Sequence, residues 1–279
     1  MMPLKSRFWA DLSTRDFARL QASPDVAEVV AVLPVAAIEQ HGPHLPVSVD
    51  TTLVDSVIAA AVPLLPANLP VLFMPTQMVG KSNEHAAFPG TLTFSAETLM
   101  RIWNELGACV ARAGIKKLVL FNSHGGQISV MDVVARDLRV AHGLLVFSSN
   151  WFTLPLPDDV MNLFTADEHR FGIHAGDMET SMLLATRPQF VDMGQARDFA
   201  STAQIRAASY PILGNGKSAK LAWQMQDYNA MGAAGNALLA TAEKGHAVID
   251  ASAAQLALLL AEVSRLPLET LRAAPVIPG

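Results

Sequence analysis

Short apolar runs alternate with stretches of helical periodicity over about the first 150 residues of the chain. The apolar runs span residues 28–37, 71–74, 117–122 and 144–148. Each has the length and apolar character of a strand that is covered on both faces. Helical spacing of apolar residues covers residues 50–61, 95–113 and 128–142. This repeated strand, loop and helix order predicts an α/β fold, a mostly parallel sheet with helices on both faces.

The periodic pattern weakens after residue 150. A helix is predicted over residues 176–187 and a last helix over residues 251–265, whereas residues 200–235 are expected to be irregular. No repeat or linker divides the chain. We therefore expect a single domain over residues 1–279, with an excursion at about residues 200–235.

The composition narrows the class of protein. Apolar residues make up 51% of the chain and charged residues only 16%, which excludes a disordered or fibrous protein. The net charge of −5 argues against a nucleic-acid or anionic-membrane binder that works through a basic face. No apolar run reaches the roughly 18 residues of a membrane-spanning helix. A small-molecule partner is the expectation, with no nucleic acid and no membrane.

The single cysteine and the N-terminal residues bear on the compartment. Cys109 excludes an intramolecular disulfide framework and lies within a helical pattern, where a core position is expected. No secretory signal is readable at the start of the chain, so a cytoplasmic location is predicted. The low content of charge favours an oligomer that buries apolar surface between subunits.

The loop after the first predicted strand carries the first candidate chemistry. Glu39 and His41 are two residues apart, so in an extended segment their side chains project to the same side. Asp50 follows where a helix begins, and is either the N-cap of that helix or a metal ligand. Two carboxylates and an imidazole form a ligand set that suits Zn²⁺ or Mn²⁺, and an aspartate can bridge two ions.

His124 directly follows the third predicted strand. Because ligands bind beyond the carboxyl ends of parallel strands, His124 is expected at the same edge of the sheet as Glu39 and His41, although it is also acceptable as a plain turn residue. The paired glycines Gly125 and Gly126 allow the backbone to approach a ligand closely, which makes them candidates for substrate binding.

Two further candidate residues belong to the region of the predicted helix at 176–187, one inside the helix and one before it. Glu179 shares a helical stripe with Met182 and Leu183, so we expect it to point toward apolar surroundings, where an unpaired carboxylate is costly. Either a bound cation or a buried arginine or lysine would compensate for its charge. His174 precedes the helix and is placed as a mobile acid or base.

The polar loop at residues 80–90 is longer than a simple connection needs and is expected to line a site. Ser82 and His85 are its candidates for substrate binding, with a solvated loop histidine as the alternative for His85. Trp151 either forms the floor of the pocket or belongs to the core.

These residues resemble the creatininase (creatinine amidohydrolase) family. Four motifs occur in the family's order over about residues 29–192, namely EQHGPH at 39–44, FPGT at 88–91, NSHGG at 122–126 and HAGDMETS at 174–181. The resemblance implies a three-layer α/β/α fold, assembly into hexamers and two divalent metal ions, Zn²⁺ and/or Mn²⁺ with Fe²⁺ as a further option. It also implies hydrolysis of a C–N amide bond by a metal-bound water.

Residue roles follow from the resemblance by position. It implies that Glu39 and His124 hold one ion, that His41 holds the other and that Asp50 bridges them. His174 stands where the family places a catalytic histidine.

The chain departs from the family pattern in the loop after the strand-end histidine. Creatininase proper has a tyrosine where this chain has Gly125 and a glutamate where it has Gly126, so a substrate other than creatinine is expected. Small cyclic amides, formamides and short peptides are the candidates. Glu179 is the predicted replacement ligand, or a catalytic proton donor if it binds no metal. A single-metal or non-catalytic binding protein and a lactone hydrolase are the alternatives.

Overall fold

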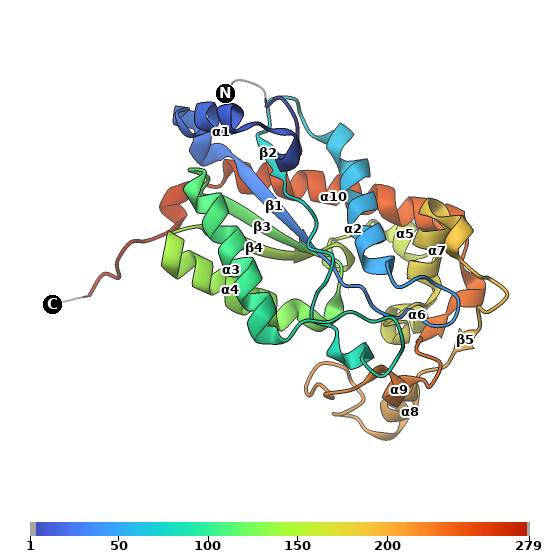
Figure 1. Ribbon diagram of the computed structural model, residues 1–279. Coiled ribbons are helices and arrows are strands. Elements are labelled where there is room, and N and C mark those ends of the chain that lie inside the picture. The colour runs from blue at the N-terminus through green and yellow to red at the C-terminus, as the bar shows by residue number, and fades with distance from the viewer. Residues whose placement is uncertain (1–3, 278–279) are drawn as a thin grey trace.

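A four-stranded parallel sheet forms the centre of the computed structural model, which describes residues 4–277 (Figure 1). The strand order is β2-β1-β3-β4. The strands are β1 (Val30–Val35), β2 (Val71–Phe73), β3 (Lys117–Asn122) and β4 (Leu145–Asn150). All residues of β1, β2 and β3 are buried, as the uninterrupted apolar runs predict.

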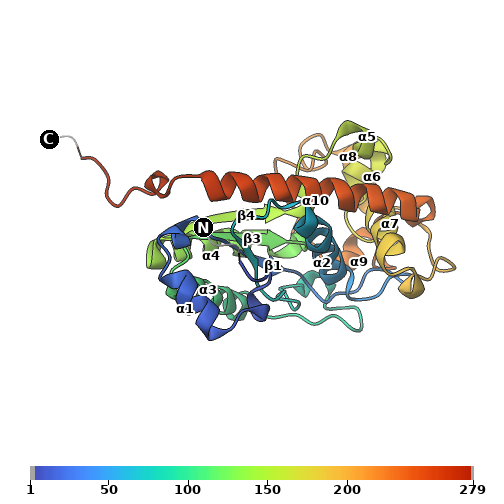
Figure 2. The same ribbon diagram turned by 90° about the horizontal axis from the view of Figure 1, so that it is seen from above.

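Side chains alternate between the two faces of the sheet, and each face has its own hydrophobic core. Val30 and Val32 of β1 belong to the core on one face. Three helices contribute many of the remaining side chains of that core, namely α2 (Val49–Ala61), α7 (Asp177–Thr186) and α10 (Ala242–Arg265). Figure 2 shows α10 running along this side of the sheet.

Ala31 and Leu33 of β1 belong to the core on the other face. The helices of this layer are α1 (Thr14–Gln21), α3 (Ala96–Arg112) and α4 (Ile128–His142). The architecture is therefore α/β/α in three layers, as predicted. Of these helices, α1 is the one that the periodicity did not predict.

Capping residues mark where α3 and α4 begin or end, close to the limits that the sequence predicts. Ser95 caps α3, its hydroxyl accepting a hydrogen bond from the backbone N–H of Thr98 at 3.2 Å. Gly114, with φ of +84°, follows the end of α3. Gly143 adopts the left-handed conformation at the end of α4.

The last helix, α10, begins at Ala242, so the prediction of residues 251–265 was wrong about its start. Thr241 caps the helix by accepting a hydrogen bond from the N–H of Lys244 at 3.3 Å. By length and composition α10 is the one helix within residues 4–277 that could cross a membrane. It packs against α7 and α2 in the structure, and 44% of its most apolar window is buried.

The predicted excursion starts and ends at a two-stranded antiparallel ladder. β5 (Asp198–Phe199) pairs with β6 (Gly235–Asn236) and brings the two ends of the segment together. The segment is not wholly irregular as expected, because it contains α8 (Thr202–Ser209) and α9 (Met225–Tyr228). The remaining short helices, α5 (Asp158–Met161) and α6 (Ala166–Phe171), precede α7 and were not predicted.

Candidate metal centre

The loops after β1 and β3 meet at the carboxyl edge of the sheet. Val35 and Asn122, the last residues of the two strands, are paired in register. Glu39 and His41 therefore lie beside His124, and all three side chains are buried. This meeting of loops follows from the parallel pairing, as the sequence predicts.

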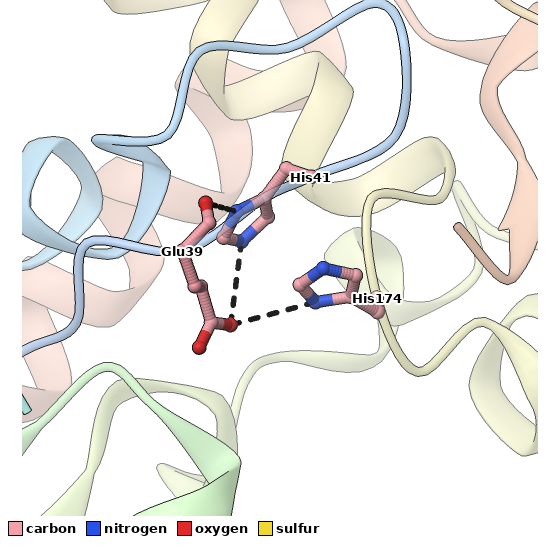
Figure 3. Close-up of side chains that lie close together, drawn as sticks. All are labelled: Glu39, His41 and His174. Carbon is pink, nitrogen blue, oxygen red and sulfur yellow. Dashed lines mark hydrogen bonds and ion pairs between the residues drawn. The ribbon is translucent and has the colours of Figure 1, made fainter. Parts of the chain in front are cut away.

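Glu39 and His41 point to the same side of their loop (Figure 3). His41 donates a hydrogen bond from Nδ1 to the backbone carbonyl of Glu39 at 2.9 Å. In the neutral ring this bond places the proton on Nδ1 and leaves the lone pair on Nε2. That nitrogen lies 4.0 Å from Oε1 of Glu39 and has no hydrogen-bond partner within the described part of the chain.

Asp50 lies between two histidines. Its Oδ1 is 3.4 Å from Nε2 of His41 and its Oδ2 is 3.4 Å from Nδ1 of His124. Ser48 occupies the N-cap position of α2, so the alternative of Asp50 as the cap was wrong. The carboxylate therefore connects the histidines from the loops after β1 and β3.

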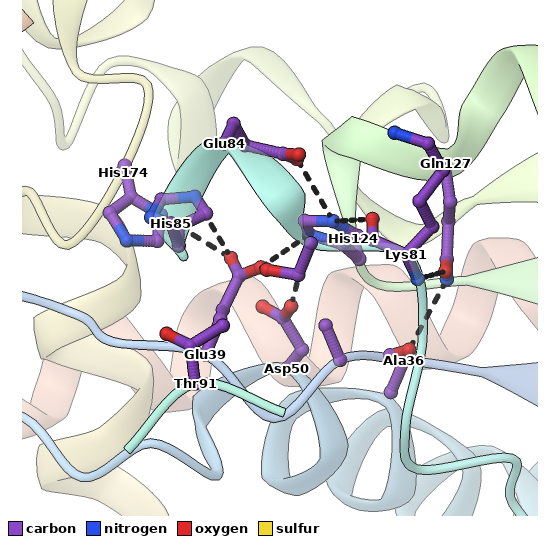
Figure 4. Close-up of polar contacts among 12 residues, drawn as sticks. Ala36, Glu39, Asp50, Lys81, Glu84, His85, Thr91, His124, Gln127 and His174 are labelled. Carbon is purple, nitrogen blue, oxygen red and sulfur yellow. Dashed lines mark hydrogen bonds and ion pairs between the residues drawn. The ribbon is translucent and has the colours of Figure 1, made fainter. Parts of the chain in front are cut away.

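His124 is oriented by the loop before α3 (Figure 4). Its Nε2 donates to the carbonyl of Lys81 at 2.9 Å, which leaves Nδ1 facing Oε2 of Glu39 at 3.1 Å. The hydroxyl of Ser82 also donates to Oε2 of Glu39. Ser82 thus holds the carboxylate that faces His124, a role that the sequence did not assign to it.

His174 forms hydrogen-bond and ring contacts on both sides of its ring. Its Nε2 donates to the backbone carbonyl of Gln40 at 2.7 Å, and its Nδ1 faces Oε1 of Glu39 at 3.7 Å. The ring lies between those of His41 and His85, with ring centroids 4.1 and 4.3 Å away. His174 is 6% exposed, so Nδ1 faces the interior of the site and not solvent.

Glu179 reaches the site from the first turn of α7. Its Oε2 accepts a hydrogen bond from the N–H of Ala175 at 2.6 Å and lies 3.9 Å from Nε2 of His41. Ala175 has a φ of +54°, a conformation that non-glycine residues rarely adopt, and it presents this N–H to the carboxylate. Within residues 4–277 no lysine or arginine forms an ion pair with Glu179, which favours the cation over the buried basic residue.

The electrostatics of the histidines and carboxylates reflect a strong excess of negative charge. Burial works against a charged His41, but Asp50, Glu179 and Glu39 raise its pKa to about 9. Burial likewise opposes charge on His124, whose pKa its carboxylate neighbours, led by Glu39, raise well above the usual value.

The pKa of Glu179 is raised, whereas those of Asp50, His174 and His85 are lowered. Burial raises the pKa of Glu179 to about 7, with the nearby carboxylates adding to the shift and His41 opposing it. Asp50 is buried as well, yet His124 and His41 hold its pKa well below the usual range. Burial, together with the positive charge of His41, lowers the pKa of His174 far below 6.5 and that of His85 to about 3.

The donor atoms present fit two divalent cations. Three groups of possible ligands occur, each with ligand atoms within 4.8 Å of one another, namely Glu39–His41–His174, Glu39–Glu84–His124 and His41–Asp50–Glu179. Three buried atoms of these groups have no hydrogen-bond partner in the described chain: Nε2 of His41, Oδ2 of Asp50 and Oε1 of Glu84. Four carboxylates converge here, and two divalent ions would balance their charge. Mixed oxygen and nitrogen donors suit Zn²⁺ and Mn²⁺.

The other predicted site residues differ in their placement. His85 is 2% exposed and lies 3.5 Å from Oε1 of Glu39, so it is not a solvated loop histidine. Trp151 is buried in the core, and its indole N–H donates to Ser123 at 3.0 Å. Gly125 faces open space, because a Cβ built on it would meet no atom within 4 Å.

Sequence reasoning missed Gln40 and Trp223. Gln40 joins three parts of the site through its side-chain nitrogen, which lies 2.7 Å from Nδ1 of His85 and 2.8 Å from the carbonyl of Gly232. Trp223, from the excursion, stands edge-on to the His85 ring with centroids 6.1 Å apart. Gln40 lies between the predicted ligands Glu39 and His41, and this position could have marked it as a site residue. No local sequence pattern marks Trp223.

Comparisons with known proteins identify relatives of this chain. A family model described as creatinine amidohydrolase matches residues 10–260. The creatinine amidohydrolase of Pseudomonas putida is 30% identical over 208 residues, which cover 70% of this chain and 77% of that enzyme. The mycofactocin precursor peptide peptidase of Mycolicibacterium smegmatis is 30% identical over 164 residues, 58% of this chain. The match to that peptidase spans 60% of its length.

Solved structures show the same fold. The structure of a putative creatinine amidohydrolase from Bacteroides fragilis superposes with a TM-score of 0.73 at 25% identity, covering 86% of this chain and 91% of that chain. A mutant creatininase of the Zn-Zn type superposes with a TM-score of 0.71 at 25% identity and covers 92% of this chain and 98% of that chain.

Proposed function

This chain belongs to the creatininase family, and on that premise we propose that it is a metal-dependent amidohydrolase. The reaction is hydrolysis of a C–N amide bond in a small cyclic amide, a formamide or a short peptide. The observation that carries the proposal is the position of Asp50, whose two carboxylate oxygens face the free nitrogens of His41 and His124 at 3.4 Å each.

Two ion positions follow from the donor atoms. Glu39, Asp50 and His124 would hold one ion, and His41, Asp50 and Glu179 would hold the other. Zn²⁺ or Mn²⁺ is the proposed metal, with Fe²⁺ also compatible with these donors. The name of a structural neighbour, a creatininase of the Zn-Zn type, supports two zinc ions.

The bound ions would supply an activated water at neutral pH and would polarise the substrate carbonyl. The protein's own contribution is the handling of the proton. His174 donates from Nε2 to the carbonyl of Gln40, which leaves the lone pair of the neutral ring on Nδ1. Nδ1 is therefore available to accept a proton from the attacking water and to pass it to the leaving nitrogen.

The shape of the site supports a small substrate. Glu39, His41 and Asp50 are each 2% exposed or less, so the reacting group must reach buried side chains rather than bind at a surface. His85 lies beside Glu39 and contacts the ring of Trp223 edge-on. Relatives named creatinine amidohydrolase and mycofactocin precursor peptide peptidase support a cyclic amide or a peptide as the proposed substrate.

A substrate panel tests the proposal. Protein loaded with Zn²⁺ or Mn²⁺ is incubated with creatinine, a six-membered cyclic amide, an N-formyl amine and a tripeptide, and amine or carboxylate release is measured. We expect turnover of at least one member that is lost in His41→Ala and retained in His246→Ala, which alters an exposed histidine on α10. Equal turnover in His41→Ala and the wild type would refute the proposal.

A further inference from the structure

Gln40 has a buried side-chain amide whose orientation is fixed by two backbone groups. The N–H of Gly42 donates to Oε1 of Gln40 at 3.0 Å. Nε2 of Gln40 donates to the carbonyl of Gly232 at 2.8 Å. If the amide were turned over, two donors would face each other at Gly42 and two acceptors at Gly232. One orientation of the amide therefore satisfies both backbone groups.

The excursion packs directly against this amide. Gly232 has a φ of +82°, and a Cβ built on it would lie 2.2 Å from Oε1 of Gln40 and 2.9 Å from Cε1 of Phe88. The chain can approach the amide this closely because residue 232 is a glycine. The excursion thus helps to hold the side chain of Gln40 in its orientation.

The orientation of the amide determines where His85 carries its proton. Nδ1 of His85 lies 2.7 Å from Nε2 of Gln40. Because Nε2 of Gln40 is a donor only, Nδ1 of His85 must accept this hydrogen bond, which places the ring proton on Nε2. A doubly protonated ring would set two donors against each other at this distance. The contact with Gln40 therefore requires a neutral His85 with its proton on Nε2.

His174 does not compete for the two amide hydrogens of Gln40. Nε2 of His174 lies 3.2 Å from Nε2 of Gln40, but it is only 2.7 Å from the backbone carbonyl oxygen of Gln40. A carbonyl oxygen only accepts, so Nε2 of His174 is itself a donor. The two amide hydrogens of Gln40 are therefore used by Gly232 and His85.

The protonated nitrogen of His85 faces a carboxylate that is a proposed metal ligand. Nε2 of His85 lies 3.5 Å from Oε1 of Glu39 (Figure 4). The other oxygen of Glu39, Oε2, accepts a hydrogen bond from Ser82 and lies 3.1 Å from Nδ1 of His124. The two oxygens of Glu39 thus have different neighbours. In the described chain His85 belongs to none of the three groups of possible metal ligands.

We propose that Gln40 is a positioning residue that keeps His85 as a neutral donor, and that His85 holds Oε1 of Glu39 so that Oε2 is offered to the ion beside His124. Partners of this kind orient metal ligands without touching the metal. The part of the inference that concerns the ion rests on the proposed function, whereas the tautomer of His85 does not depend on a bound ion.

Solid-state ¹⁵N NMR of protein labelled in its histidine rings tests the tautomer, with and without Zn²⁺. We expect the signals of His85, identified by their loss in His85→Gln, to show a proton on Nε2 and none on Nδ1. Gln40→Glu replaces the donor by an acceptor and should place a proton on Nδ1. Gln195→Glu, a change at an exposed glutamine, is the matched control and should alter nothing. A proton on Nδ1 in the wild type, or an unprotonated Nδ1 in Gln40→Glu, would overturn the proposal.

Metal affinity tests the effect on Glu39. His85→Ala should weaken the binding of one of the two Zn²⁺ ions by about 10- to 100-fold, the usual range for loss of a partner that orients a ligand. His85→Gln keeps an N–H donor at the end of the side chain and should restore most of the affinity. Competition with a chromophoric chelator measures both variants, with His246→Ala as the control. Wild-type affinity for both ions in His85→Ala would refute the role assigned to His85.

These measurements separate the inference from the proposed function. A wild type that binds two ions and hydrolyses an amide, beside a His85→Ala variant with unchanged affinity for both ions, would remove the inference alone. A wild type that cannot hold two ions would overturn the proposed function and the role of His85 toward Glu39. The NMR result would then still decide the tautomer that Gln40 imposes.

Discussion

Three histidines of the site are each oriented by a backbone carbonyl. His41 donates to the carbonyl of Glu39, His124 to that of Lys81 and His174 to that of Gln40. These bonds fix the tautomers and direct the other ring nitrogens toward the carboxylates. The polypeptide thus sets the ligand atoms before any ion binds.

The metal-free protein carries protons where ions would bind. With its pKa raised to about 9, His41 is protonated at pH 7 and must lose that proton to act as a ligand. We expect proton release on binding of Zn²⁺ at pH 7, visible in calorimetry as an enthalpy that changes with the ionisation enthalpy of the buffer. An enthalpy that is the same in all buffers would contradict the protonation assigned to His41.

The same group sets a pH dependence of stability. The pKa of His41 is about 9 in the folded state and about 6.5 in the unfolded chain, so between pH 6.5 and 9 only the folded state binds this proton. The stabilisation that the proton gives to the folded state is therefore fully present below about pH 6.5. The free energy of unfolding of metal-free protein should therefore fall as pH rises from about 7 through 9. Urea unfolding at several pH values measures this, with His41→Ala as the variant in which the decrease becomes smaller.

Substitution of His174 is expected to have a different effect from substitution of a metal ligand. His174→Ala should retain two ions per chain while turnover falls by about 10²- to 10⁴-fold, the usual range for a lost acid or base. His41→Ala should lose both metal content and turnover. Loss of an ion from His174→Ala would instead make His174 a ligand, as its grouping with Glu39 and His41 permits.

At the scale of elements, α7 presents Glu179 to the site and α10 holds α7 in place. Gly245 of α10 lies against the backbone of α7, since a Cβ built on it would be 2.0 Å from the carbonyl oxygen of Ser181. The close approach of the two helices therefore depends on a glycine.

Gly245→Ala distinguishes this contact from simple helix propensity. In an unconstrained helix the change would stabilise the protein by about 1 kcal/mol. Here we expect a lower free energy of unfolding and weaker ion binding, because α7 and Glu179 must shift. Stabilisation in urea unfolding would show that the two helices can separate freely.

Helices and strands that local sequence patterns mark could be predicted from the sequence. Contacts between loops that are distant in the sequence could not. The limits of β3 and α4 agree with the pattern because apolar runs and Gly143 mark them locally. The placement of Glu39, His41 and His124 followed from the rule for strand ends. The contact of Glu84 with His124 was missed, because it depends on how the long loop before α3 folds back over Gly126.

At the scale of the whole molecule, the excursion leaves apolar side chains in solvent. Ile205, Ile212 and Leu213 are 68%, 63% and 59% exposed in the single chain. Exposed apolar residues gathered in one segment are typical of a contact surface. This feature supports the proposed assembly into a homo-oligomer, for which the family resemblance suggests a hexamer.

Light scattering coupled to gel filtration measures the assembly. We expect an oligomeric mass for the wild type and a shift toward smaller species when Ile212 and Leu213 are both replaced by aspartate. A monomeric wild type at micromolar concentration would contradict the assembly.

The central claim is a centre of two ions, and elemental analysis tests it most directly. Protein purified without chelator, and then incubated with Zn²⁺ or Mn²⁺ and desalted, should contain two ions per chain, whereas Asp50→Ala should contain fewer. A wild type that holds one ion or none after this treatment would contradict the account and would favour a single-metal or non-catalytic binding protein.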